Sequence, residues 1–367
     1  MAGVEAGTDF EGRLEEMRRE AYLKGRIDSP GVRPAGSPMP MASPQEGYYR
    51  QPLLKEPQWT PLVPLYFFVG GASGSLGVIG SLADVFSGEK ELAQKARVMS
   101  FAGVAISSAL LILDLGRPSR FLNMLRVFKP QSPMSVGSWV LAGFGASSAV
   151  ANLADFVAAE WGDGALAAQL RVVGRAGCVL FGMPFHNYTG VLIGASVIPV
   201  WNTRVRSLPR KFGISGLQSA VGLLELTGET ASNALNMLGL VSAAFETWEG
   251  ADLLRNHDPS LLPAKRGSSG ILVQLAGAIS GPLPITLRIA SLLTREKKTL
   301  RRIAAVCGIA GSILMRYGWI RAGAVSARDW RIPLEIEQPA ANAHRVKSQE
   351  TSRLEDATQR SMDRTRV

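Results

Sequence analysis

Eight mainly apolar stretches follow one another through the middle of this 367-residue chain. Each is long enough to cross the hydrocarbon core of a bilayer, which takes about 20 residues of helix. Because backbone polar groups in lipid must pair within their own segment, helices are the expected structure. The stretches are residues 61–86, 97–115, 134–159, 170–200, 211–227, 230–250, 268–294 and 301–321. The sequence therefore predicts an all-α, multi-pass membrane protein with eight transmembrane helices.

The polar ends of the chain set the boundaries of the membrane domain. Residues 1–57 and 322–367 are polar and charged, whereas residues 58–321 contain all eight apolar stretches. We therefore expect a polar N-terminal tail, an eight-helix membrane domain and a polar C-terminal tail. The spacing of the stretches is compatible with two four-helix bundles, although the sequence shows no convincing internal repeat.

Both tails carry signals of local structure. Phe10–Tyr22 interleaves charges with apolar positions, which predicts a short amphipathic helix. Residues 28–46 are rich in Pro, Gly and Ser, as is typical of a flexible linker. Residues 338–367 have no long apolar face, which is typical of disorder.

The net charge of +10 is distributed as in a membrane protein. In a soluble protein such a charge would suggest nucleic acid as a partner. Here most of the 40 Lys and Arg residues lie in the tails and the even-numbered loops, so the positive-inside rule predicts that both termini are cytoplasmic. Residues 1–57 contain no apolar core of a signal peptide. We expect a protein of the cytoplasmic (inner) membrane, in contact with lipid and not with nucleic acid.

Six of the seven tryptophans lie at or near the end of an apolar stretch. Tryptophan is enriched where a membrane meets water, because its ring is apolar and its N–H is polar. We therefore expect an aromatic belt rather than core packing. The six are Trp59, Trp139, Trp161, Trp201, Trp248 and Trp319.

The cysteines and histidines limit the cofactors that this chain can hold. The two cysteines are Cys178 and Cys307, whereas an iron–sulfur cluster usually takes four thiolates. Of the three histidines only His186 lies in an apolar stretch, so the sequence lacks the two facing histidines that hold a membrane haem. We therefore expect neither a haem nor an iron–sulfur cluster in this chain.

Charged residues inside the apolar stretches are the candidates for function. Placed centrally, each costs roughly 2.5–3.5 kcal/mol on insertion scales, so such residues are rare without a role. Asp84, Asp155 and Glu246 lie near stretch ends and are expected to be interfacial, and Arg175 and Arg288 are candidate structural partners of these three acids. The charged residues are Asp84, Asp114, Asp155, Arg175, Glu225, Glu229, Glu246, Arg288 and Arg316.

Glu225 and Glu229 form a candidate pair for proton transfer. They are four residues apart, so they share a helix face if the helix continues through both. Two close carboxylates raise each other's proton affinity, which suits proton exchange near neutral pH. The alternative is a cluster of acids where a helix end meets water.

Two further polar clusters interrupt the apolar pattern. Asp114 and Arg117 flank the end of the second stretch, in Leu-Asp-Leu-Gly-Arg-Pro. Either Arg117 or Arg316 can hold the acid ionised, and Arg117 has an alternative role in capping the helix and binding a lipid phosphate. His186 and Tyr188 lie in Phe-His-Asn-Tyr-Thr-Gly within the fourth stretch, where buried polar groups need partners and can line a pocket.

These residues carry a resemblance to the NrfD/PsrC family, the integral membrane subunits of polysulfide reductase-like and nitrite-reductase-linked complexes. The matching stretches occur in order along nearly the whole apolar region, although residues 211–294 contribute little. Residues 193–198 are less polar than is common in the family. The stretches are Tyr66–Gly71, Leu113–Pro118 with Arg120–Met124, Ser132–Trp139, Tyr188–Leu192 running to Pro199–Trp201, and more weakly Gly311–Arg316 with Trp319.

The resemblance implies a quinone-reactive subunit of a respiratory oxidoreductase complex, rather than a complete enzyme. It implies a quinone or quinol ligand (menaquinone or ubiquinone) and electron exchange with an iron–sulfur, ferredoxin-like subunit and further redox subunits. Asp114, Tyr188 and Arg117 are the residues expected to act in the reaction, because a carboxylate can take a proton and a phenol can bind a quinone oxygen. The expected quinone-binding residues are Asp114, Tyr188, His186, Arg316 and Tyr66.

Two other functions use the same features. A secondary transporter or proton channel would use the same intramembrane acids, and usually has internal repeats with broken helices. Pro184 and Gly281–Pro284 are candidate breaks. A passive membrane anchor with a degenerate quinone pocket would keep the fold and lose the ligand. The side of the membrane on which a partner docks also stays open, because family partners often lie outside whereas the charge count places the loop after Asp114 inside.

Overall fold

The computed structural model describes most of the chain, in two units that we treat separately: Met1–Gln51 and Pro52–Val367. In the first unit, α1 (Glu5–Leu23) confirms the helix predicted around Phe10–Tyr22. The predicted linker at 28–46 and the predicted disorder at 338–367 lie outside the described residues. The described residues are 5–24, 54–57, 59–86, 88–115, 117–294 and 297–329.

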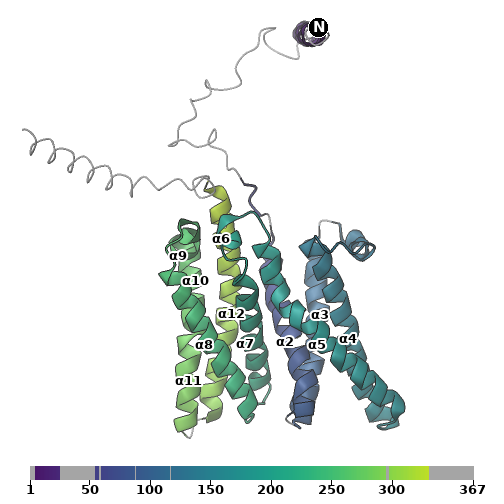
Figure 1. Ribbon diagram of the computed structural model, residues 1–367, viewed down its shortest axis with the longest axis vertical. Coiled ribbons are helices and arrows are strands. Elements are labelled where there is room, and N and C mark those ends of the chain that lie inside the picture. The colour runs from purple at the N-terminus through teal and green to yellow at the C-terminus, as the bar shows by residue number, and fades with distance from the viewer. Residues whose placement is uncertain are drawn as a thin grey trace, which may run out of the picture. The chain divides into compact units, whose positions relative to one another are not determined.

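The second unit consists of long helices that run alongside one another, and its described residues contain no strand (Figure 1). Every predicted stretch overlaps one long helix, except that the seventh is divided into α10 and α11. The long helices are α2 (Leu62–Phe86), α3 (Lys90–Asp114), α4 (Pro133–Trp161), α5 (Ala165–Gly194), α7 (Leu208–Leu226), α8 (Asn233–Arg255), α10 (Gly267–Ser280), α11 (Pro282–Leu293) and α12 (Lys297–Arg328). The short ones are η1 (Pro118–Leu125), α6 (Pro199–Asn202), η2 (Pro259–Leu261) and α9 (Leu262–Lys265).

Six candidate membrane spans occur among the described helices, where eight were predicted. They are long and apolar enough to cross a bilayer, and α10 and α11 count together as one span, Gly267–Leu293. The other five are α2, α3, α4, α5 and α12. α7 and α8 are helices at the predicted places but fall outside this group; α8 carries three acids, Glu246, Glu249 and Asp252. The chain is therefore an all-helical, multi-pass membrane protein.

The prolines that were predicted to break helices have different effects in two of the candidate spans. The break predicted at Gly281–Pro284 is confirmed, because α10 ends at Ser280 and α11 begins at Pro282. Proline suits the first position of a helix, where its missing N–H would have no partner inside the helix. Pro184, in contrast, lies inside α5 and does not end it.

Helix packing divides the second unit into two groups. α3 and α4 pack with α2 and α5, whereas α8, α10 and α11 pack with α7 and α12. The groups meet where α2 and α5 contact α7, and where α2 contacts α12 (Figure 1). Glycines allow this close approach: a Cβ on Gly216 of α7 would lie 2.7 Å from the carbonyl oxygen of Gly71 of α2.

Two tryptophans predicted for the aromatic belt are instead core residues. Trp201 and Trp319 are 1% and 2% exposed, and Trp201 Nε1 donates a hydrogen bond to the Trp319 carbonyl oxygen at 2.8 Å. Trp59 stacks on Trp201 with ring centroids 5.5 Å apart. The belt prediction was wrong here because a stretch end in the sequence is not always a helix end at the surface. Trp139, Trp161 and Trp248 are exposed, as a belt requires.

Ion pairs inside the helix groups confirm Arg175 as a structural partner of Asp84 and Asp155, whereas Arg288 pairs with Glu225 and not with one of the three expected acids. Arg175 contacts Asp84 at 2.5 Å and Asp155 at 3.7 Å, so it joins α5 to α2 and α4. Arg288 donates to both carboxylate oxygens of Glu225 at 2.7 Å, and both side chains are fully buried. A buried pair of this kind is costly to break, because either partner alone is an uncompensated charge.

Removing one partner of the buried pair is expected to destabilise the protein strongly. Arg288→Met should lower the free energy of unfolding by about 3–5 kcal/mol, because Glu225 is left without its cation. Arg171→Met is the matched control, since Asp163, its partner, is largely exposed and surface pairs contribute about 1 kcal/mol or less. Thermal unfolding in detergent would compare the two. Equal midpoints for both variants would contradict the expectation.

Candidate functional site

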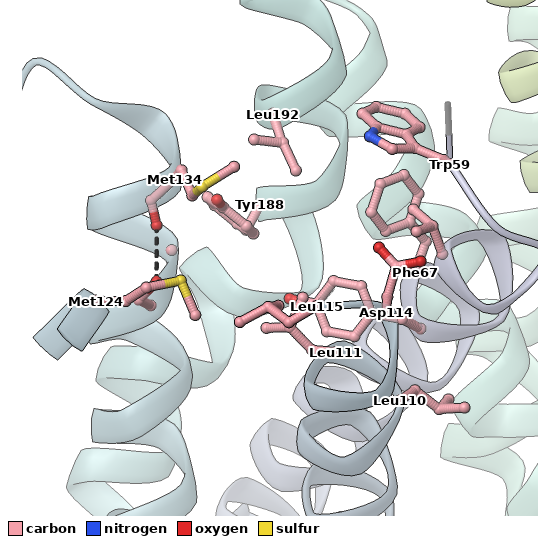
Figure 2. A pocket seen from close by; sticks show the side chains of 14 residues that line it. Trp59, Phe67, Leu110, Leu111, Asp114, Leu115, Met124, Met134, Tyr188 and Leu192 are labelled. Atoms are coloured by element: carbon pink, nitrogen blue, oxygen red, sulfur yellow. Dashed lines mark hydrogen bonds between the residues drawn. The ribbon is translucent and has the colours of Figure 1, made fainter. Parts of the chain in front are cut away.

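A cavity of about 160 Å³ lies at the end of the second unit where α2 begins and α3 ends. Its walls come from α2, the end of α3, η1, the start of α4, and α5 (Figure 2). Most of the lining is apolar. The side chains that bring oxygen atoms to it are Tyr66, Asp114, Ser138 and Tyr188. The cavity is thus an apolar chamber with a few polar groups, which is typical of sites for small organic molecules.

Asp114 is the last residue of α3 and is half-buried. Its Oδ1 accepts a hydrogen bond from the Thr60 hydroxyl at 2.5 Å. Thr60 Oγ1 in turn accepts from the backbone N–H of Leu62 at 3.3 Å, at the start of α2. The start of α2 therefore orients the carboxylate toward the cavity.

Tyr188 approaches the cavity from α5 and is 8% exposed. Its hydroxyl donates to the Pro133 carbonyl oxygen at 2.9 Å, where α4 starts. The position of its ring requires Gly137, since a Cβ there would overlap the ring. Tyr66, on α2, is also buried and lines the same cavity. Two phenols and one carboxylate thus share one chamber.

The cavity suits a flat ring that carries oxygen atoms. Trp59 and Phe67 supply aromatic walls, and Met124 and Met134 supply flexible thioethers, which adapt to an irregular ligand (Figure 2). The Tyr188 oxygen keeps a lone pair while it donates, so a ligand hydroxyl can bond to it. The Asp114 carboxylate can accept a second donor beside Thr60. The chamber can therefore bind a ligand with hydroxyl or carbonyl groups and take up its proton.

Four of the sequence stretches that carry the resemblance meet at this cavity. Tyr66–Gly71 gives two lining residues, and Leu113–Pro118 with Arg120–Met124 gives three more. Ser132–Trp139 gives Met134, Gly137 and Ser138, and Tyr188–Leu192 gives its first and last residues. Sequence reasoning placed Trp59 at the membrane surface and did not single out the two methionines. The quoted stretches already contained both methionines, so that signal was present.

Arg117 does not line the cavity. It is exposed and precedes η1, so Thr60 takes the place next to Asp114 that was expected for an arginine. The chain turns between α3 and η1, which separates the two members of the expected Asp114–Arg117 pair.

His186 and Arg316 also lie outside the cavity lining. His186 Nδ1 is 3.1 Å from the Gly182 carbonyl oxygen, within its own helix. Arg316 is buried in α12, where its guanidinium donates to Ser215, Ser312 and the Phe212 carbonyl oxygen. Gly71 makes room for that guanidinium, because a Cβ there would lie 2.8 Å from Arg316 Nη2. Both residues therefore belong to the contact between the helix groups.

Glu225 and Glu229 do not share a helix face. α7 ends at Leu226, and Gly228 with φ +115° turns the chain away. Glu225 pairs with Arg288, whereas Glu229 pairs with Lys95 Nζ at 2.6 Å. The expected carboxylate pair is thus wrong in its geometry, because each acid has its own cation.

Comparison with known families adds one finding. The family model described as "Polysulphide reductase, NrfD" matches residues 56–233, which include all 14 residues that line the cavity. Over these residues the chain is similar to the NrfD family. The resemblance noted from the sequence is confirmed, and the family consists of membrane subunits of respiratory oxidoreductase complexes. No curated protein matches the chain significantly.

Filling the space next to the Tyr188 ring is expected to disturb the cavity. Gly137→Ala should lower the free energy of unfolding by about 1–3 kcal/mol, because the added methyl group overlaps the ring. Gly145→Ala, on the same helix, is the control, since its Cβ would meet only Val104 Cγ2 at 3.8 Å. Thermal unfolding in detergent would compare them. The packing we describe is wrong if both glycines tolerate alanine.

Proposed function

We propose that this chain is the quinone-reactive membrane subunit of a respiratory oxidoreductase complex. The observation that carries the proposal is the cavity in which Asp114, Tyr188 and Tyr66 come together within apolar walls. A quinol is a flat ring with two hydroxyl groups and an apolar tail, so it needs an apolar chamber with few polar contacts. Similarity to the NrfD family over residues 56–233 supports the same function.

The residues of the cavity would divide the work of binding and proton transfer. The Tyr188 hydroxyl would bond one ring oxygen and fix the orientation of the ring. Asp114 would accept a hydroxyl proton from the quinol, since a carboxylate within hydrogen-bond reach is a suitable general base. Loss of two electrons and two protons turns the quinol into the quinone. Asp114 lies at a helix end, so a proton held there has a short route to water.

The electrons need an acceptor close to the cavity. We propose an iron–sulfur subunit, with further redox subunits, docked on the end of the second unit where the cavity lies. The segment from α3 to α4, which contains η1, would form part of this docking surface, because it lies beside the Asp114 end of the cavity. The ligand would be menaquinone or ubiquinone, held without haem or iron–sulfur cluster in this chain.

The topology that we propose has eight crossings in the cytoplasmic membrane, with both termini on the cytoplasmic side. α7 and α8 would cross with their polar faces turned inward. The buried Glu225–Arg288 pair supports this, because it removes both charges from contact with lipid. The hydrogen bond between Thr60 and Asp114 places the start of α2 beside the end of α3. The proposed topology requires this, because α2 and α3 would cross the membrane twice between these two points.

Replacing the two polar groups is expected to reduce turnover without loss of assembly. Asp114→Asn should lower quinol oxidation about 100-fold or more, because the amide cannot take the proton. Tyr188→Phe should lower it about ten-fold through loss of one hydrogen bond. Asp163→Asn is the matched control for the aspartate, since Asp163 precedes the start of α5, at the opposite end of that helix from Tyr188, and does not line the cavity. The measurement is quinol oxidation by the purified complex.

Binding can be measured separately from turnover. Fluorescence quenching of a quinol-site inhibitor on the purified chain should saturate at one equivalent, and Asp114→Asn should weaken it. Normal turnover and normal binding in both cavity variants would remove Asp114 and Tyr188 from the mechanism. Loss of turnover with unchanged partner retention would support the proposal over a passive anchor.

A further inference from the structure

A second cavity, of about 430 Å³, lies between α8 and α10 in the other helix group. Its inner wall holds the side chains of Glu246 and Lys211, which are 1% and 5% exposed. Its outer rim includes Gln274 and Pro282, which are exposed. This cavity shares no lining residue with the first one, and its α8 and α10 walls lie beyond the residues that match the family.

The carboxylate of Glu246 has an incomplete environment. Among the described residues neither of its oxygens accepts a hydrogen bond. The Lys211 ammonium nitrogen lies 3.5 Å from Glu246 Oε2, so the two groups form a long ion pair. A buried carboxylate needs hydrogen-bond donors, because the cost of leaving water is otherwise not offset. A ligand that brings a donor into the cavity would complete this environment.

Two glycines show that the space between the helices is a groove and not a packed contact. A Cβ on Gly250 of α8 or Gly277 of α10 would meet no atom within 4 Å. At the packed crossings the opposite holds: a Cβ on Gly74 would be 3.0 Å from the Gly182 carbonyl oxygen. Since both glycines line the cavity, side chains of neighbouring helices leave room there for another molecule.

The opening of this cavity lies midway along a candidate membrane span, where the hydrocarbon of the bilayer would surround it. Gln274, Ala278 and Pro282 are exposed on its rim and lie in the middle of the candidate span Gly267–Leu293. A ligand that enters there comes from the bilayer, so it must be lipid-soluble. Most of the lining residues other than Glu246 and Lys211 are apolar or small, which suits an apolar tail.

We propose that this second cavity binds a lipid-soluble molecule whose polar head donates a hydrogen bond to Glu246 and accepts one from Lys211. Quinol hydroxyls and the ammonium and phosphate groups of an amine-headed phospholipid share this chemistry. The site is independent of the one at Asp114, and it holds whether or not the first cavity binds a quinol.

The test is ligand binding by the purified full-length chain, followed by native mass spectrometry. One arm compares phosphatidylethanolamine with phosphatidylcholine, which lacks the N–H donor. The other compares a naphthoquinol with its dimethyl ether, in an Asp114→Asn, Tyr188→Phe background that weakens the first cavity. In at least one arm, the ligand with the N–H or O–H donor should bind with one-to-one stoichiometry. It should also bind at least ten-fold more tightly than its methylated counterpart. The arm that responds identifies the source.

Two variants connect this binding to the cavity. Glu246→Gln should weaken the donor-bearing ligand about ten-fold, because hydrogen bonds to a charged acceptor are stronger. Gly277→Leu should abolish binding by filling the groove, where its Cβ meets open space. Glu249→Gln is the matched control: Glu249 is buried one helical turn away and does not line the cavity.

Three results would overturn the proposal. They are equal binding of the methylated and unmethylated ligands, equal binding by wild type and both cavity variants, and no stoichiometric binding to folded protein. The last result would mean that water fills the cavity. Loss of turnover in the Asp114 and Tyr188 variants bears only on the first cavity, so failure of one proposal is distinguishable from failure of the other.

Discussion

The structure depends on the close packing of α2, the most deeply buried of the six candidate spans. Its glycines allow close contact with neighbouring helices: a Cβ on Gly71 would lie 2.8 Å from Arg316 Nη2 of α12, and one on Gly74 would lie 3.0 Å from the Gly182 carbonyl oxygen of α5. In lipid no hydrophobic force drives helices together, so small residues that permit dense packing and hydrogen bonding must do so. α2 thereby fixes the position of Tyr66 and Phe67, which form one wall of the first cavity.

That cavity exists because large and small residues alternate at the helix ends. Gly137 gives the Tyr188 ring its place, and the Thr60 hydroxyl holds Asp114 where α3 stops. The groups come from four helices and the segment before α2, so the site is assembled only when the whole first helix group has packed. A polar group positioned in this way keeps its orientation without a ligand, which lowers the cost of binding.

The sequence predicted the helices well, because apolar length and flanking polarity are strong signals in membrane proteins. It also named three residues of the cavity, Asp114, Tyr188 and Tyr66, through stretches that converge in space. It failed where the result depends on packing between distant segments. The burial of Trp201 and the partner of Glu225 are set by contacts more than 60 residues apart in sequence. Spacing along one helix cannot show these contacts.

The carboxylates of the two cavities have different surroundings, and this difference would separate the roles that we propose for them. Asp114 is half-buried at a helix end, with a neutral hydroxyl as its partner, so its charge can change without leaving a cation unbalanced. Glu246 is fully buried beside the ammonium of Lys211, and protonation would leave that cation uncompensated. The first arrangement suits proton exchange, whereas the second suits holding a polar head in a fixed place. One helix group would therefore carry the redox chemistry, and the other would bind a membrane-derived ligand without reacting with it.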